Sequence, residues 1–160
     1  MNDSLHLSWT DIDGYVSDIA ASIRASGFVP DFLIGIATGG LIPLAYLSKK
    51  LGVRDVATVS ARSYEGTAQN ELRISNVPDI DLHGRSVLLV DEIADSGKTL
   101  RAVVELFSER GASALKTATL AVRSDKCTFR PDFFALECDR WVEFPWDASP
   151  GSVHTEASTR

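Results

Sequence analysis

Two carboxylates, a short polar loop and the start of a helix follow one another in this chain, and together they could bind a sugar phosphate. The apolar run Val87–Val90 leads into Asp91 and Glu92, and the loop Ala94–Thr99 comes next. Backbone N–H groups of such a loop and the positive end of the helix dipole converge on an anion. Carboxylates in front of an anion site indicate a ligand that also carries hydroxyl groups or a metal ion. A ribose 5′-phosphate fits, since its hydroxyls suit the acids and its phosphate suits the loop.

Two other interpretations of this segment are weaker. Gly97, Lys98 and Thr99 resemble the end of a nucleoside-triphosphate P-loop, but that motif requires a glycine where this chain has Glu92. An ordinary strand–turn–helix junction would leave it unexplained that the acidic pair, Ser96, Gly97 and Thr99 all fall where a ribose phosphate needs them.

The elements around this segment predict a doubly wound α/β fold with a mostly parallel sheet and helices on both faces. Helical spacing of apolar residues covers 12–23, 41–51 and 100–107, and apolar runs typical of strands cover 31–37, 56–63, 87–91, 115–122 and 133–137. Ser8 or Thr10 could cap the first helix, and Gly27 could end it. In such sheets the ligand binds beyond the carboxyl ends of the strands. The loop Ala94–Thr99 and a second glycine-bearing loop, Gly35–Gly40, both fall there.

The remaining segments indicate one domain with a lid. Residues 1–147 fit a single domain, given a chain of 160 residues. The segment 65–81 is polar and weakly periodic, and we expect it to lack secondary structure and to act as a mobile lid or binding loop. The small polar residues of 148–160 predict a disordered tail.

Composition excludes several classes of protein. The formal net charge of −6 argues against a nucleic-acid partner, which would favour a basic face. No signal peptide is evident, and the apolar stretch 32–47 is interrupted by glycines and Pro43, so no membrane span is predicted. Cys127 and Cys138 are not in a C-x-x-C arrangement, which favours reduced cysteines and a cytoplasmic protein.

The segment Val87–Thr99, read as Val-Leu-Leu-Val-Asp-Glu-Ile-Ala-Asp-Ser-Gly-Lys-Thr, resembles the phosphoribosyl pyrophosphate (PRPP) signature of type I phosphoribosyltransferases. From about Trp9 to Asp147 the chain is similar to the bacterial xanthine–guanine branch of that family. The resemblance implies transfer of the phosphoribosyl group of PRPP to a 6-oxopurine (xanthine, guanine or hypoxanthine) with release of pyrophosphate. It also implies Mg²⁺ as cofactor and a homo-oligomer, either a dimer or a tetramer.

The resemblance assigns roles within the signature. Asp91 and Glu92 would bind the ribose hydroxyls, and Asp91 would also face the Mg²⁺ ion. Asp95 would accept a proton from the base and so act as the catalytic residue. The residues expected to surround the 5′-phosphate are Ala94, Asp95, Ser96, Gly97, Lys98 and Thr99.

The second loop resembles the pyrophosphate loop of the family, with one departure. Gly39 and Gly40 match, but the xanthine–guanine enzymes usually have Arg where this chain has Thr38, so one positive contact to pyrophosphate is missing. Arg73 could supply such a contact. Ser63 and Tyr64 match the dipeptide that opens the mobile hood of the family.

The base-binding residues implied by the resemblance are Arg123, Trp141 and Val142. Arg123 stands where a Lys donating to the 6-oxo group is expected, and its planar guanidinium has a different geometry, so Lys126 is a second candidate. Trp141 would stack on the purine. Trp146 is interpreted as a core residue that packs the chain end.

Two rival functions stay open at this point. One is a non-catalytic regulator that senses PRPP or a nucleotide with the same fold. The other is a phosphoribosyltransferase for another heterocyclic base, an alternative that the Arg123 departure keeps open.

Overall fold

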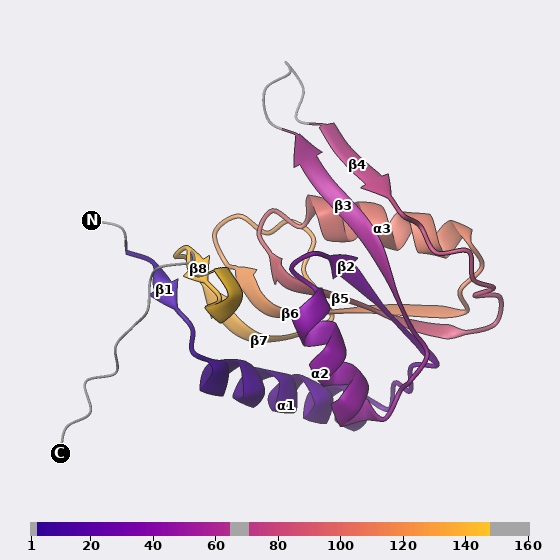
Figure 1. The fold of residues 1–160 in the computed structure, drawn as a ribbon, viewed down its shortest axis with the longest axis horizontal. Coiled ribbons are helices and arrows are strands. Elements are labelled where there is room, and N and C mark those ends of the chain that lie inside the picture. The colour runs from indigo at the N-terminus through magenta and orange to yellow at the C-terminus, as the bar shows by residue number, and fades with distance from the viewer. Residues whose placement is uncertain (1–2, 65–70, 148–160) are drawn as a thin grey trace.

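A six-stranded sheet forms the centre of the molecule, with strand order β4-β3-β2-β5-β6-β7 (Figure 1). The computed structural model describes residues 3–64 and 71–147. The strands of this sheet are β2 (Phe32–Ala37), β3 (Val56–Tyr64), β4 (Glu71–Ser75), β5 (Ser86–Ala94), β6 (Ala114–Arg123) and β7 (Phe133–Cys138). Neighbouring strands are parallel except for the antiparallel pair β3–β4. The predicted α/β class with a mostly parallel sheet is confirmed.

Helices cover both faces of the sheet, because the central strands carry apolar side chains on both faces. On one face, α1 (Trp9–Ser26) and α2 (Leu41–Leu51) pack on a core that includes Leu33 and Leu88. On the other face, α3 (Lys98–Glu109) packs on a core that includes Ile34 and Leu89. Adjacent residues of β2 and β5 therefore supply two separate cores, which is why β2 and the segment Val87–Val90 of β5 are continuously apolar. Figure 1 shows α1 and α2 together, with α3 across the sheet.

The ends of α1 follow local sequence signals. Ser8 Oγ accepts a hydrogen bond from the Asp11 N–H at 3.1 Å, and the Asp11 carboxylate accepts one from the Ser8 N–H at 2.8 Å. This capping box selects Ser8 over Thr10 as the N-cap. Gly27 ends the helix with φ of 78°, a conformation that glycine adopts without steric penalty.

One sequence prediction is wrong in part. We expected 65–81 to lack secondary structure, but Glu71–Ser75 forms β4, an antiparallel partner of β3. Leu72 and Ile74 are half-buried while their neighbours are exposed, and so short an alternation is hard to recognise without its partner strand. Residues 65–70 and the predicted tail 148–160 lie outside the described part of the chain.

A small second sheet joins the two ends of the described chain. β1 (Leu5–His6) pairs in parallel with β8 (Val142–Glu143), which is followed by the 3₁₀ helix η1 (Pro145–Asp147). The N–H of Leu5 donates to the Trp141 carbonyl at 2.7 Å, and the N–H of Leu7 donates to the Glu143 carbonyl at 2.9 Å. This sheet fixes the segment that carries Trp141.

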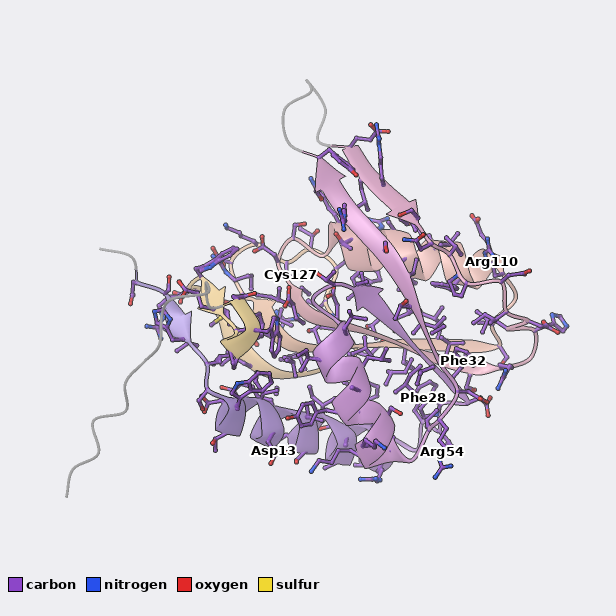
Figure 2. The ribbon with its side chains drawn as sticks, in the orientation of Figure 1. Asp13, Phe28, Phe32, Arg54, Arg110 and Cys127 are labelled. Carbon is purple, nitrogen blue, oxygen red and sulfur yellow. The ribbon has the colours of Figure 1, made fainter. Side chains whose placement is uncertain are left out.

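The two ends of the main sheet differ in what they carry. Phe32 and Arg54 lie at the amino-terminal end of the strands, while Cys127, after β6, lies toward the carboxyl end (Figure 2). None of the described helices is long and apolar enough to cross a membrane.

Candidate functional site

Two adjoining cavities lie at the carboxyl ends of β2, β3 and β5. The larger one has a volume of about 370 Å³ and the smaller one about 190 Å³. Asp91, Ser63 and Thr99 line both. The larger cavity is also lined by Ile36, Ala37, Thr38, Gly39, Ala61, Arg62 and Glu92, and the smaller by Ile93, Ala94, Asp95, Ser96, Gly97 and Leu100. The structure therefore brings together the two loops and the acidic pair that the sequence singled out.

The acidic pair is half-buried, and no cation pairs with it in the described part of the chain. Burial raises the pKa of Asp91 to about 8 and also raises the pKa of Glu92. Within residues 3–64 and 71–147, neither carboxylate takes part in an ion pair. The Asp91 Oδ1 accepts the Glu92 N–H at 2.8 Å. Acids in such a position are suited to a ligand that brings hydroxyl donors or a positive charge.

This donor set suits a magnesium ion that arrives together with a phosphate ligand. The part of the chain that the structure describes holds no group of three or more His, Cys, Asp or Glu side chains able to bind a metal. Mg²⁺ takes oxygen ligands, keeps several waters and is often held by one or two carboxylates plus substrate phosphates. Asp91, with Glu92 beside it, fits that arrangement.

The loop Ala94–Thr99 has a fixed shape. Gly97, with φ of 84°, is the N-cap of α3, and a Cβ there would lie 2.6 Å from the Phe129 carbonyl oxygen. Both the N–H and the hydroxyl of Thr128 donate to the Ser96 carbonyl, at 3.0 and 3.1 Å. Ala94 is the buried last residue of β5, and Lys98 is exposed at the start of α3. The connection after β6 thus supports the loop from outside.

The second loop needs both of its glycines. A Cβ on Gly40 would lie 2.5 Å from the Val90 carbonyl oxygen, and one on Gly39 would lie 2.2 Å from the Glu92 carboxyl group. Thr38 is exposed and lines the larger cavity. The close approach of this loop to β5 explains why a side chain is excluded there.

Sequence reasoning missed Arg62, which lines the larger cavity. Arg62 is opposite Arg73 in the β3–β4 pair, so the two side chains lie on the same face. The guanidinium of Arg73 lies 4.9 Å from the centre of the Tyr64 ring and 3.4 Å from a Glu71 carboxylate oxygen, and Arg73 lines neither cavity. Arg62 is the one cation among the described residues that line this cavity, which Thr38 also lines.

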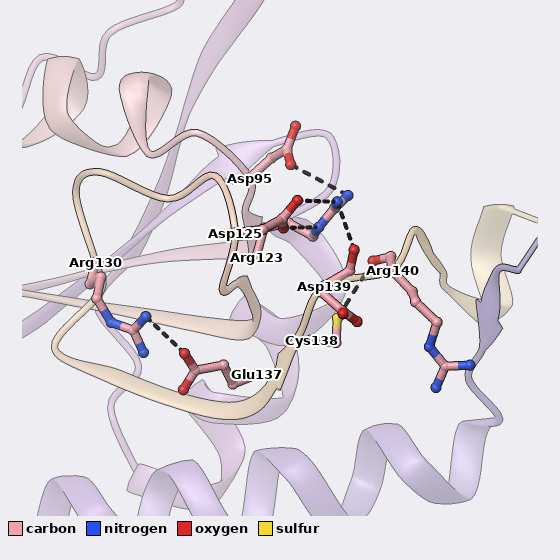
Figure 3. Close-up of polar contacts among 8 residues, drawn as sticks. All are labelled: Asp95, Arg123, Asp125, Arg130, Glu137, Cys138, Asp139 and Arg140. Atoms are coloured by element: carbon pink, nitrogen blue, oxygen red, sulfur yellow. Dashed lines mark hydrogen bonds and ion pairs between the residues drawn. The ribbon is translucent and has the colours of Figure 1, made fainter.

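Arg123 is more enclosed than a freely accessible base donor would be. Only 7% of its side chain is exposed, and its guanidinium lies 3.2 Å from Asp125 and 3.7 Å from Asp95 (Figure 3). It also donates to the Asp139 carbonyl at 3.0 Å. Arg123 therefore connects the proposed proton acceptor Asp95 to the connection after β6, where Lys126 is exposed.

The aromatic residues near the chain end have different surroundings. Trp141 is 60% exposed, which suits a stacking surface better than a core residue. The Val142 side chain is buried in β8. Trp146 packs against the core as predicted, and in addition its Nε1–H donates to Glu92 Oε2 at 2.9 Å. No local pattern could reveal this contact, since the two residues are 54 positions apart.

Comparison with known proteins identifies the family to which this fold and site correspond. The model of the phosphoribosyl transferase domain matches residues 8–152, and the chain belongs to this family. A xanthine–guanine phosphoribosyltransferase of Cereibacter sphaeroides is 33% identical over 89% of this chain and 86% of its own length. The predicted family is confirmed.

Solved structures agree with this assignment. A purine phosphoribosyltransferase from Pyrococcus horikoshii Ot3 has a TM-score of 0.83 and 32% identity, over 92% of this chain and 96% of that chain. A xanthine–guanine–hypoxanthine phosphoribosyltransferase from Helicobacter pylori has a TM-score of 0.80 and 28% identity, over 91% and 94%.

Proposed function

We propose that this protein is a purine phosphoribosyltransferase that joins a 6-oxopurine to the ribose of PRPP and releases pyrophosphate. The observation that carries the proposal is the pair Asp91 and Glu92, which lies half-buried between two loops suited to anions and forms no ion pair within residues 3–64 and 71–147. The names of the relatives support xanthine, guanine and hypoxanthine as candidate bases.

In the proposed reaction, the bond between the anomeric carbon and pyrophosphate breaks and a bond to a purine ring nitrogen forms. Positive charge develops on the ribose as the leaving group departs, as in glycosyl transfer. Asp91 and Glu92 bind the ribose hydroxyls, and the loop Asp95–Thr99 binds the 5′-phosphate. When bound at Asp91, Mg²⁺ would neutralise charge on the pyrophosphate oxygens. Catalysis then rests mainly on positioning and electrostatics.

On the base side, Asp95 accepts the proton that the purine loses. Asp95 is exposed, and Arg123 at 3.7 Å holds it near the end of β6. Trp141 stacks on the ring, and Val142, whose side chain is buried, offers only its backbone. Ser63 and Tyr64 would begin a hood over this site, with Ser63 lining both cavities.

We also propose that Arg62 contributes positive charge to pyrophosphate binding at the loop that contains Thr38, Gly39 and Gly40. Arg73 would be a second cation on the same face of the antiparallel pair β3–β4. Arg62→Gln is expected to weaken inhibition by pyrophosphate about 3- to 10-fold, the range of one partly exposed charged hydrogen bond. Arg54→Gln is the matched control, because Arg54 is exposed at the other end of the sheet. Equal inhibition constants for both variants would remove Arg62 from the site.

A panel of bases tests the function. Xanthine, guanine, hypoxanthine and adenine are incubated separately with PRPP and Mg²⁺, and the products are identified by mass. A nucleoside monophosphate from at least one 6-oxopurine is the expected result. Product from adenine alone would favour transfer to another base, and PRPP binding without any product would favour a regulator.

We also propose the extent of the domain, the location of the protein in the cell and its oligomeric state. Residues 1–147 would form the functional domain, and the protein would act in the cytoplasm, since Cys127 and Cys138 are both free thiols. Exposed apolar side chains such as Leu41 and Val29 would be available for a homo-oligomer.

A further inference from the structure

We propose that Trp146 is a positioning residue, whose indole N–H holds the Glu92 carboxylate in the orientation needed to bind the ribose. This inference rests on the proposed function, because it assumes that Glu92 binds PRPP. It adds a role for the chain end that goes beyond base stacking by Trp141.

The Glu92 carboxyl group is confined from two sides. The indole Nε1 of Trp146 donates to Oε2 at 2.9 Å. The Gly39 backbone lies so close that an ideal Cβ there would be 2.2 Å from Oε1 and from the carboxyl carbon. Three segments far apart in sequence, namely the Gly39 loop, the end of β5 and η1, therefore meet at one carboxylate.

Trp146 itself is held in place by its neighbours. Its ring stacks on Phe144 with centroids 4.9 Å apart and planes 11° apart, and the Trp9 ring lies at 5.9 Å. Phe144 is 4% exposed. Asp147 closes the turn, since its carboxylate accepts the Phe144 N–H at 2.9 Å and its own N–H donates to the Phe144 carbonyl at 3.0 Å. The indole N–H thus approaches Glu92 from a rigid support.

Confinement of this kind matters for affinity. A free Glu side chain would lose rotamer freedom when it binds a hydroxyl, which weakens binding. An indole N–H donates a hydrogen bond but cannot accept one. It therefore satisfies one Glu92 carboxylate oxygen and does not compete with that carboxylate for the hydroxyl protons of the ligand. The remaining acceptor positions of the carboxylate stay available to the ribose hydroxyls.

Trp146→Phe tests the inference because it keeps an aromatic ring and removes the donor. The dissociation constant of PRPP with Mg²⁺ is expected to rise about tenfold, as for the loss of one hydrogen bond to a charged group. Trp9→Phe is the matched control: it removes an indole N–H from the same aromatic cluster, and PRPP affinity should change by less than about twofold. The melting temperatures of both variants are measured to show whether either substitution destabilises the fold.

A Glu92→Ala background separates positioning from general support of the fold. If Trp146 acts through Glu92, Trp146→Phe should not weaken PRPP binding further in that background, since the effects of coupled residues do not add. An equal loss in both backgrounds, or an equal loss for Trp9→Phe, overturns the inference.

Two further outcomes separate failure of the proposed function from failure of this inference. Absence of PRPP binding by the unaltered protein contradicts the proposed function, whereas PRPP binding that Trp146→Phe leaves unchanged contradicts this inference alone. Should Trp146→Phe fail to fold, the indole N–H resonance of Trp146 gives a second readout. It is expected to shift on Glu92→Ala, and an unchanged resonance would also overturn the inference.

Discussion

Changing Asp91 to Asn and Glu92 to Gln together is expected to abolish transfer and to weaken Mg²⁺-dependent PRPP binding about 100-fold or more. The proposed ribose site consists of these two carboxylates, and each charged hydrogen bond contributes about 1.5–3 kcal/mol. The amides keep the side-chain volumes, and Gln can still accept the Trp146 N–H. Calorimetric titration with PRPP and Mg²⁺ measures the loss. Unchanged PRPP affinity would show that these acids do not bind the ribose.

The same site predicts that Asp91→Asn stabilises the free protein, more at pH 8 than at pH 5. Burial raises the pKa of Asp91 from 3.8 to about 8. Between these values the folded protein binds a proton that the unfolded chain releases, so the stability of the native protein falls as pH rises. Asn does not titrate and avoids this loss. Each kcal/mol gained raises the melting temperature by about 2–4 °C.

Asp79→Asn is the control for this stability measurement, because Asp79 is exposed. Its melting temperature should follow that of the unaltered protein at both pH values. If Asp91→Asn lowers the melting temperature, or if its gain is larger at pH 5, then Asp91 is ionised in the free protein.

The second large effect concerns the base pocket. Trp141→Ala is expected to lower kcat/KM for every purine by a similar factor, about 5- to 150-fold, because stacking contributes roughly 1–3 kcal/mol for any base. Arg123→Met keeps much of the stem and removes the donor. It is expected to lower kcat/KM for 6-oxopurines selectively and to affect adenine, if adenine is used, very little.

The ion pairs of Arg123 provide an explanation if Arg123→Met does not act selectively on 6-oxopurines. Arg123 lies 3.7 Å from Asp95 and 3.2 Å from Asp125. If Arg123→Met lowers kcat/KM equally for all bases, Arg123 acts by holding Asp95 and does not read the 6-oxo group. Lys126→Met would then be the next variant to compare on the same bases.

The parts of the fold that the sequence predicted are those determined by local patterns. The helix Leu41–Leu51 was predicted with the observed bounds, since Pro43 in its first turn, the lysines in its last turn and the following Gly52 are all local signals. The end of β5 was predicted at Asp91, but pairing of Ala94 with Val122 extends the strand. Continuation of a strand depends on a neighbouring strand, which a local pattern does not contain.

For the candidate site too, the sequence predicted the features that lie in local motifs and not those that depend on contacts between distant segments. The acidic pair and both loops occur as compact motifs, and the structure brings them to one end of the sheet. The burial of Arg123 and the contact between Trp146 and Glu92 depend on segments distant in sequence. Arg62 was missed because an arginine in a strand has no distinctive spacing.

The pairing of β1 with β8 bears on how the protein matures during translation. Leu5 is synthesised before its strand partner Val142, which follows much later in the chain. The central strands can form while synthesis continues, since domains fold as their residues emerge. Trp141 and Trp146 reach their places only after this late pairing. A nascent chain that lacks Trp146 would leave the Trp9 ring without this aromatic neighbour.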